Sequence, residues 1–367
     1  MVGLRDSDVR TARFGFAVDG TRFREIRRTL HMSQADLMTR LNQVIGRKYD
    51  KPKLSRWENG KEPVPTEVQA ALARMLEAKP ANAQVLVLAN QKGGVGKTTS
   101  AMNIAGSLAR LGLRVLMIDL DPQATVTTGL LASAAVDAYR RGRTMAHVIL
   151  GDTALGDIII KQGEILADGR AVPFDLAASH IELSETDGKR EPGFDVAVRE
   201  ALEPVRGAYD WIVIDAPPNL GMLTWMALAA AELVIIPVRT EPFDTMGVGL
   251  ILGTINKVQR RLNPSLRLAG ILPTQFDRRK SVDREVLAHL SGSLGAVAPL
   301  LSPVPNSAVF GHAARNGRLV VDVSSTSAAA GVYRELAVAL SKGTALPRAD
   351  LQSLVQQLQE EPTHGPH

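Results

Sequence analysis

Short runs of apolar residues recur along the chain after residue 84, and amphipathic segments separate them. The runs lie at residues 85–89, 114–120, 209–215, 233–238 and 268–272. Apolar runs of this length are typical of strands that are buried on both faces of a sheet. Amphipathic stretches such as residues 98–111 indicate helices between them. The alternation predicts an α/β fold with a doubly wound parallel sheet.

The first part of the chain shows helical spacing only. Ser33 is an N-cap residue before a helix whose apolar face includes Leu37 and Leu41. Thr66 is expected to cap a later helix that carries an apolar stripe. These patterns predict a small all-α domain.

A shorter helix is predicted between these two, at residues 52–59. Pro52 suits the first turn of a helix, and Gly60 stops it. We expect Leu54 and Trp57 to belong to the core, because a helix this short needs an apolar side to hold it.

The boundary between the two regions is predicted in the segment 77–84, which lacks apolar periodicity and contains Pro80. We therefore expect a helical domain at 1–82 and an α/β domain at 83–345. The tail, 346–367, is expected to hold one short amphipathic helix with acidic flanks, which disfavours binding to anionic lipid. Residues 131–206 have no clear pattern and are expected to face partners or a dimer.

Charge is distributed unevenly between the two predicted domains. Residues 1–82 contain 16 Lys and Arg against 10 Asp and Glu, whereas the remainder contains 27 against 28. The positive excess indicates that the first domain meets nucleic acid, and a merely solvated basic surface is the alternative.

Composition excludes several classes of protein. The chain has no cysteine, which excludes disulfides and thiolate metal sites and favours a reducing, cytoplasmic setting. The N-terminus does not have the pattern of a secretory signal. The longest apolar-rich run, 226–238, contains Glu232 and is too short to span a bilayer.

A glycine-rich loop joins the first apolar run to the first amphipathic helix of the α/β region. Residues 92–99 read Lys-Gly-Gly-Val-Gly-Lys-Thr-Thr. Backbone N–H groups in such a loop, and the positive end of the following helix, face bound phosphates. The generic pattern G-x-x-x-x-G-K-[ST] would place glycine at position 91, where this chain has Gln91. The loop is therefore a deviant P-loop, in which Lys92 compensates.

Acidic residues follow two of the apolar runs. Asp119 and Asp121 lie at the end of the run 114–120, and Asp215 ends the run 209–215. Ligands of α/β sheets bind at the carboxyl ends of the strands, so Asp215 is predicted to be the Walker B carboxylate beside the loop. A structural or helix-capping role is the alternative for Asp119.

The helical region resembles the helix-turn-helix of the Cro and phage-repressor family. The resemblance rests on Ser-Gln-Ala-Asp-Leu at 33–37 and Leu-Ser-Arg-Trp-Glu-Asn-Gly-Lys-Glu-Pro at 54–63. It implies a recognition helix in the DNA major groove. About six additional residues relative to that family fall in the turn 44–50, and a purely structural helical cap is the alternative. The residues expected to reach bases or phosphates are Lys51, Lys53, Ser55 and Arg56.

The α/β region resembles the ParA family of partition ATPases, within the larger MinD/ParA group. The resemblance covers about residues 84–340 and rests on five ordered segments. They read KGGVGKTT, DLDPQAT, YDWIVIDAPPNLG, VIIPVRTEPFDTMGVGLILGTI and PTQFDRR. With a helix-turn-helix in front, the chain is similar to the longer branch of that family, which also represses its own operon.

The resemblance implies ATP and Mg²⁺ as cofactors. Lys97 would hold the β- and γ-phosphates, and Thr98 would ligate Mg²⁺ together with Asp119 and Asp215. Lys92 would reach the partner's phosphates across an ATP-sandwiched dimer. The expected nucleotide-binding residues are Lys92, Gly93, Gly94, Val95, Gly96, Lys97, Thr98, Thr99 and Pro305, with Gln275 and Asp277 also near the adenine.

Hydrolysis is expected to depend on three residues. Asp121 would position the attacking water, while Lys92 and Lys97 would neutralise charge, because phosphoryl transfer needs charge neutralisation and an in-line water.

DNA binding without sequence preference is expected from a basic cluster at Arg278 and Arg279. In shorter ParA relatives an arginine at the place of Arg279 has this role. A second family arginine falls at Val309, so Arg315, with Arg318, is expected to substitute. The alternatives are a site at Lys257, Arg260 and Arg261, or a solvated basic face.

The leading hypothesis is a DNA-segregation ATPase of the cytoplasm and nucleoid. ATP would close a homodimer that binds DNA, and a ParB-type partner would stimulate hydrolysis. Three alternative functions have different requirements. A nucleotide-sensing repressor would lack the partner, a MinD-type membrane regulator would need a basic C-terminal helix, and an iron-protein electron donor would need cysteine ligands.

Overall fold

The chain separates into two compact units, residues 1–81 and 82–367. The computed structural model describes residues 18–29, 32, 34–77, 83–189, 191–241 and 245–350. The predicted cap Ser33 and most of the predicted C-terminal helix therefore lie outside the described residues. No helix in the described ranges is long and apolar enough to cross a membrane.

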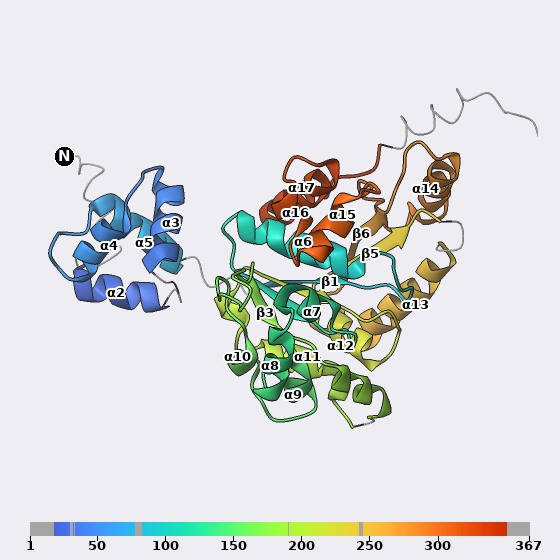
Figure 1. Cartoon of the computed structure of the whole chain (residues 1–367), viewed down its shortest axis with the longest axis horizontal. Helices are drawn as coiled ribbons and strands as arrows, with labels where there is room; N and C mark the ends of the chain where they lie inside the picture. The colour runs from blue at the N-terminus through green and yellow to red at the C-terminus, as the bar shows by residue number, and fades with distance from the viewer. Residues whose placement is uncertain are drawn as a thin grey trace, which may run out of the picture. The chain divides into compact units, whose positions relative to one another are not determined.

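Six parallel strands form the sheet of the second unit, in the order β3-β2-β4-β1-β5-β6 (Figure 1). The predicted doubly wound parallel sheet is confirmed. All five predicted strands are present, shifted at their ends by two residues at most, and a short additional strand, β3, pairs with β2. The bounds are β1 Gln84–Leu88, β2 Val115–Asp119, β3 Asp175–Ala177, β4 Trp211–Asp215, β5 Leu233–Arg239 and β6 Arg267–Thr274.

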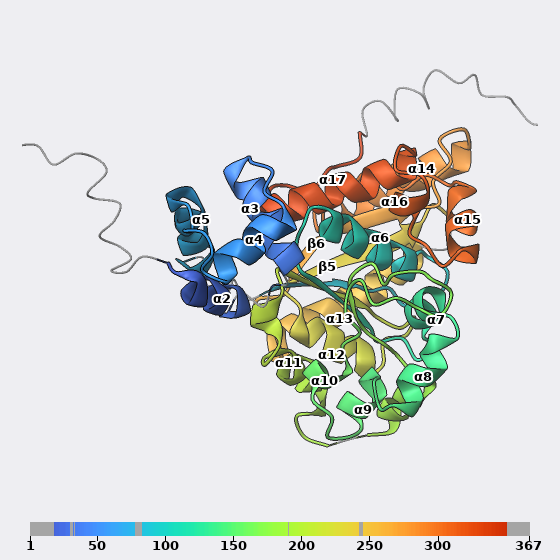
Figure 2. The same cartoon turned by 60° about the vertical axis from the view of Figure 1, so that its left-hand side comes forward.

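Helices cover both faces of this sheet (Figures 1 and 2). One apolar cluster joins the sheet to α6 and α17, and the other joins it to α12 and α13. The α-helices are α6 Lys97–Arg110, α7 Thr125–Leu131, α8 Ala134–Arg140, α9 Met145–Ile149, α10 Leu155–Ile158, α11 Ala197–Leu202, α12 Met222–Ala230, α13 Thr245–Arg261, α14 Ser281–Leu294, α15 Val309–Arg315, α16 Val320–Val323 and α17 Ala328–Lys342. The 3₁₀ helices among the described residues are η1 Ile181–Gly188, η2 Phe194–Val196 and η3 Arg206–Ala208.

Strand register brings the predicted acidic residues together. In the β2–β4 pair Asp119 lies beside Asp215, and in the β1–β4 pair Leu88 lies beside Asp215. The P-loop follows β1, so all three strand ends open on the same edge of the sheet. The reason is that parallel strands share the direction of their carboxyl ends.

Among its described residues the first unit contains four helices: α2 Gly20–Thr29, α3 Gln34–Ile45, α4 Lys51–Glu58 and α5 Thr66–Glu77. Helix α2 had not been predicted. Leu54 and Trp57 are fully buried, as expected, and they pack with Phe23, Leu37 and Leu41. The predicted short helix is confirmed one residue earlier at each end, and the longer α3 leaves a turn at residues 46–50.

Candidate nucleotide-binding and DNA-binding sites

The P-loop connects β1 to α6 with a backbone that glycine makes accessible. Gly94 and Gly96 have left-handed φ angles of 73° and 83°. Side chains disfavour this region, so glycine is needed at both positions. Gly96 is the N-cap of α6, and no side chain caps the helix. The N–H groups at this helix end are therefore available to phosphate oxygens.

Side chains from distant strands hold the loop in this shape. Asn90 donates to the Pro237 carbonyl at 2.7 Å and accepts from the Lys92 N–H at 3.2 Å. Thr274 donates to the Val95 carbonyl at 2.9 Å, and Gln275 donates to the Gly94 carbonyl at 2.9 Å. Sequence reasoning missed Asn90 and Thr274. Their position directly after a buried strand, or at its end, was the available signal.

Gln275 and Pro305, both expected near the adenine, lie in neighbouring segments. Residues 304–306 pair with Phe276, which accepts from the Asn306 N–H at 2.8 Å. Asp277 instead turns toward Arg279, and this hydrogen-bonded guanidinium lowers the pKa of Asp277 to about 2. Asp277 is therefore committed to an ion pair rather than to the P-loop.

Lys97 is buried at the base of the loop, where its Nζ donates to the Lys92 carbonyl at 3.0 Å. Burial lowers the pKa of Lys97, and the charges of Asp215 and Asp121 oppose that effect. The lysine therefore lies close to both carboxylates, which is the environment expected for a phosphate-binding cation.

Asp119 is fully buried and well supported by hydrogen bonds. It accepts from the Thr127 hydroxyl at 2.7 Å, the Thr127 N–H at 2.9 Å and the Asp121 N–H at 3.3 Å. Burial raises its pKa to about 7, although the bonds from Thr127 lower it and the charge of Asp121 raises it. The structural role that was the alternative for Asp119 is thus present in the fold, beside its expected metal role.

Asp215 is also fully buried, but neither of its carboxylate oxygens has a hydrogen-bond partner among the described residues. Burial and the charge of Asp119 raise its pKa well above the ordinary value, and the nearby Thr98 hydroxyl lowers it. Thr98 makes no hydrogen bond of normal geometry to it. Buried carboxylate oxygens without partners are costly unless a cation meets them.

The donor set at this edge fits Mg²⁺ bound together with a nucleotide. Magnesium in ATP sites is held by one or two carboxylates and by substrate phosphates, rather than by a cage of protein ligands. Within the described ranges no group of three or more His, Cys, Asp or Glu could hold a metal ion. The two oxygens of Asp215, with the Thr98 hydroxyl beside them, supply what such a site needs.

A hydrogen-bonded chain ties this edge to β3. The Ser179 N–H donates to the Thr127 hydroxyl at 2.7 Å, and the Ser179 hydroxyl donates to the Asp121 carbonyl at 2.6 Å. Thr127 thus holds the Asp119 carboxylate, and Ser179 holds both Thr127 and the Asp121 backbone. Sequence reasoning did not assign either residue, because the contacts join segments 52 and 58 residues apart.

The predicted recognition helix α4 has one buried side and one accessible side. Asp50 caps it by accepting from the Lys53 N–H at 2.9 Å. On its buried side Glu58 accepts from Gln34 at 2.6 Å and pairs with Arg27. This pairing lowers the pKa of Glu58 although burial raises it. The helix is therefore fixed to α2 and α3.

Two of the expected DNA contacts share one anionic partner. Glu62 forms ion pairs with Lys53 and with Arg56 Nε, the latter at 2.6 Å. Hydrogen bonding to Lys53 lowers the pKa of Glu62. Ser55 is half-buried, and Lys51 is exposed.

The expected residues for DNA binding without sequence preference lie on two segments. Arg278 and Arg279 are exposed between β6 and α14, and the side chain of Arg279 is 84% accessible while it pairs with Asp277. Arg315 is exposed at the end of α15. Accessibility alone fits both a DNA contact and a solvated face.

Comparison with known proteins gives the family. The family described as "AAA domain" matches residues 83–268, and the one described as "Helix-turn-helix domain" matches residues 20–86. The chromosome-partitioning ATPase Soj of Thermus thermophilus is 40% identical over 263 residues, which cover 72% of this chain and 96% of that protein. The chromosome partitioning protein ParA of Caulobacter vibrioides is 36% identical over 235 residues, 62% of this chain and 85% of that protein.

This chain belongs to the ParA/MinD family of ATPases. A solved structure similar to it is the cobyrinic acid a,c-diamide synthase of Mycobacterium smegmatis with bound ADP and magnesium. That chain has a TM-score of 0.60 and 33% identity, and the match covers 72% of this chain and 98% of the other. The same protein has also been solved with an ATP analogue and magnesium. The expected ATPase activity and the cofactors ATP and Mg²⁺ are thereby confirmed at the level of the family.

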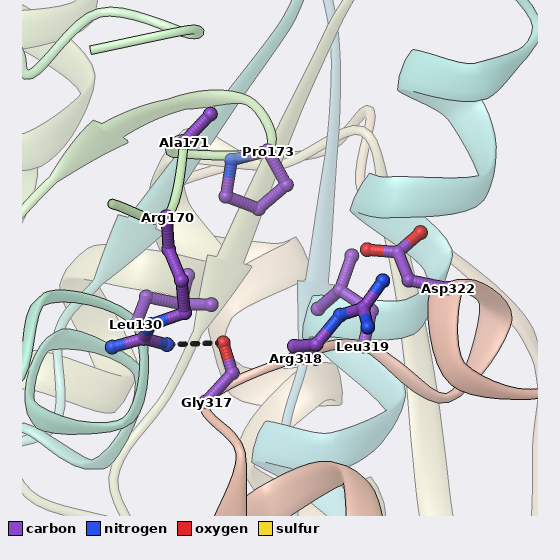
Figure 3. A pocket seen from close by; sticks show the side chains of 8 residues that line it. All are labelled: Leu130, Arg170, Ala171, Pro173, Gly317, Arg318, Leu319 and Asp322. Atoms are coloured by element: carbon purple, nitrogen blue, oxygen red, sulfur yellow. Dashed lines mark hydrogen bonds between the residues drawn. The ribbon is translucent and has the colours of Figure 1, made fainter. Parts of the chain in front are cut away.

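A pocket of about 340 Å³ lies away from the P-loop of this ParA-type domain, between α7, the segment before β3 and the α15–α16 loop. Figure 3 shows Arg170 directed at the Gly317 carbonyl, and its other nitrogens bond Asp168. Gly317 has a φ of 56°, and an added Cβ would lie 1.7 Å from the Arg170 guanidinium. The contact therefore fastens these segments together and requires glycine.

The raised pKa of Asp119 predicts a pH dependence of stability in ParA-type protein free of nucleotide and Mg²⁺. The pKa of about 7 in the folded state exceeds the ordinary value of 3.8. The contribution of Asp119 to stability is therefore complete below pH 3.8 and is lost progressively as the pH rises through 7. We expect Asp119 to make the free energy of unfolding about 1 kcal/mol larger at pH 6 than at pH 8. Urea unfolding of wild type and Asp119→Asn at both pH values measures it, and an equal pH response in the two proteins would refute it.

Proposed function

We propose that this protein is a DNA-partition ATPase that dimerises when it binds ATP and whose hydrolysis is stimulated by a ParB-type partner. The observation that carries the proposal is one chain with both a deviant P-loop, including Lys92, and a helix-turn-helix domain. Its partitioning relatives Soj and ParA support the cellular role. The diamide synthase differs in the activity its name states, and it supports only the ATP-binding domain.

At the nucleotide site, each residue has a task that its environment supports. The N–H groups of the P-loop and buried Lys97 bind the phosphates, and Asp215 with Thr98 holds the metal ion. Mg²⁺, when bound, supplies charge neutralisation to the phosphates. Asp121 orients the attacking water, and the hydrogen bond from the Ser179 hydroxyl to the Asp121 carbonyl holds its backbone in place. Lys92 acts on the partner's phosphates, so that ATP binding and dimerisation are one event.

Two DNA-binding surfaces divide the work. Helix α4, with Lys51, Lys53, Ser55 and Arg56, binds a specific operator and represses the protein's own operon. Arg278, Arg279 and Arg315 of the ATPase domain bind DNA without sequence preference once ATP has closed the dimer. The helical domain at 1–82 and the ATPase domain at 83–345 thus each bind DNA through a surface of their own.

The presence of the helix-turn-helix favours one second candidate, a repressor whose ATPase domain only senses nucleotide. DNA binding distinguishes the two functions. We expect random-sequence DNA to be bound only with ATP, and an operator to be bound also with ADP, with steep weakening by salt in both cases. If ATP left binding to random DNA unchanged, and no centromere-binding partner stimulated hydrolysis, the repressor would be the better account.

The shared partner of Lys53 and Arg56 leads to a prediction for Glu62→Gln. The wild-type carboxylate must release both cations before they reach phosphates, and it also repels the DNA. We therefore expect the variant to bind the operator about fivefold more tightly, which corresponds to the release of one or two exposed ion pairs. Fluorescence anisotropy on a duplex selected by the wild type measures the change.

Glu25→Gln is the matched control, because Glu25 pairs with Arg22 within α2 and both are exposed. The same change in net charge there should leave the affinity unaltered. Weaker binding by Glu62→Gln would instead mean that Glu62 orients the two cations for DNA.

A further inference from the structure

The turn between α3 and α4, residues 46–50, is held in one shape. Asn42 donates to the Tyr49 carbonyl at 2.9 Å and accepts from the Tyr49 N–H at 2.7 Å. The Tyr49 ring meets Trp57 edge-on, with centroids 5.0 Å apart. A loose insertion would need none of these contacts, so the turn has a fixed place beside the core.

The fixed turn presents basic side chains to solvent. Arg47 and Lys48 are exposed, and the accessible fraction of the Arg47 side chain is 62%. Arg47 pairs with the partly exposed Glu67 at 3.2 Å, an arrangement that salt screens readily. Lys48 has no ion pair among the described residues. The contacts of the partly buried Tyr49 thus position the backbone, while the side chains of Arg47 and Lys48 stay exposed.

Charge accumulates where the turn meets the recognition helix. Lys51 and Lys53 lie in the first turn of α4, which contains no acidic residue. Cations there oppose the helix dipole and do not help the helix to form. With Arg47 and Lys48 they make four positive charges within seven residues, and the acidic residue among them, Asp50, accepts a backbone N–H as the cap. Such a run of positive charge does not stabilise the fold, and it favours contact with a polyanion.

We infer that residues 46–50 form an additional DNA-contacting turn, in which Arg47 and Lys48 grip backbone phosphates at the edge of the groove that α4 enters. A recognition helix places its N-terminal residues in the major groove, so the segment directly before it borders the phosphates. The contacts are to phosphate and carry no base information. This inference rests on the proposed operator binding by α4.

The test uses the full chain and a duplex enriched by the wild type from a randomised-sequence library. We compare Arg47→Gln/Lys48→Gln with the wild type over a range of salt concentrations. We expect about tenfold weaker binding and a salt slope that is less steep by about 2, one for each lost phosphate contact. The preference for the enriched over a scrambled duplex should remain.

Two single variants supply the control. Lys48→Gln and Arg22→Gln each remove one exposed positive charge from the first unit, from the turn and from α2 respectively. Only Lys48→Gln should reduce the slope, by about 1. An unchanged slope in the double variant, or an equal loss in Arg22→Gln, would overturn the inference.

Failure of the proposed operator binding gives a separate result: the wild type would then enrich no preferred duplex from the library. Glutamine removes the charge, remains a polar and unbranched side chain, and leaves Tyr49 in place. Thermal unfolding of each variant verifies the fold. If the double variant were destabilised, the salt slope of DNA binding by the single variant Lys48→Gln would decide whether the turn contacts phosphates.

Discussion

Replacing Lys97 by alanine is expected to lower the rate of ATP hydrolysis by about 100-fold or more. Lys97 is a buried cation at the base of the P-loop, close to Asp215 and Asp121. Preorganised charge at a site that excludes water stabilises the transition state of phosphoryl transfer, and nothing in water replaces it. Release of inorganic phosphate under saturating ATP measures the effect. If Lys97→Ala hydrolysed ATP at the wild-type rate, Lys97 would not be part of the catalytic site.

Lys92→Ala is the informative companion, because Lys92 is proposed to act on the partner subunit's nucleotide. Each variant alone should be inactive. In a mixture, a dimer of one Lys92→Ala chain and one Lys97→Ala chain contains one complete site, provided that Lys92 acts across the interface. Recovery of activity on mixing is therefore the expected result. Mixed dimers that form, as shown by sedimentation, but remain inactive would contradict action across the interface.

Asp215→Asn is expected to have opposite effects on stability and activity. Asp215 is buried beside Asp119, burial and that neighbouring charge raise its pKa, and its two oxygens have no hydrogen-bond partner among the described residues. Burying this carboxyl group therefore costs stability at pH 8, and asparagine, which does not titrate, should recover about 1–3 kcal/mol of that cost. The same change should abolish Mg²⁺-dependent hydrolysis, because asparagine is a much weaker ligand for a hard cation.

Urea unfolding and phosphate release measure the two halves of this prediction. Asp210→Asn is the matched control, because Asp210 is paired with Arg114 at 2.9 Å. That variant should lose stability and keep its activity. An Asp215→Asn protein that is less stable than the wild type, yet hydrolyses ATP with Mg²⁺, would show that Asp215 is a structural residue.

Local pattern was sufficient for the main elements of the ATPase domain. The apolar runs identified five of the six strands, because strands buried on both faces need no long-range information to be recognised. The short strand β3 has no apolar run of its own, because Asp175–Ala177 is three residues long and is completed by pairing with β2. Its strand end was indicated only by the resemblance of residues 175–179 to a family segment. Helix α2 escaped because its sequence is mostly polar, with Phe23 and Ile26 as its buried residues.

The candidate site was only partly accessible from the sequence. Gly94, Gly96 and Lys97 form one continuous motif, so their roles follow from local spacing. Asn90 was not recognised, since its partner Pro237 lies 147 residues away. The ion pairs of Glu62 with Lys53 and Arg56 were missed for another reason, because a charged residue in a turn gives no sign of which cation it meets.

Local sequence was sufficient to predict the strand ends that carry Asp119 and Asp215, the phosphate loop after β1, and a basic helical unit in front. Apolar periodicity, glycine and capping residues encode these features over a few neighbouring positions. Only the tertiary structure decided that Asp119 is fully bonded while Asp215 is left without partners, and that the turn at 46–50 is fixed. Strand register and packing between distant segments set these properties, and local sequence does not specify them.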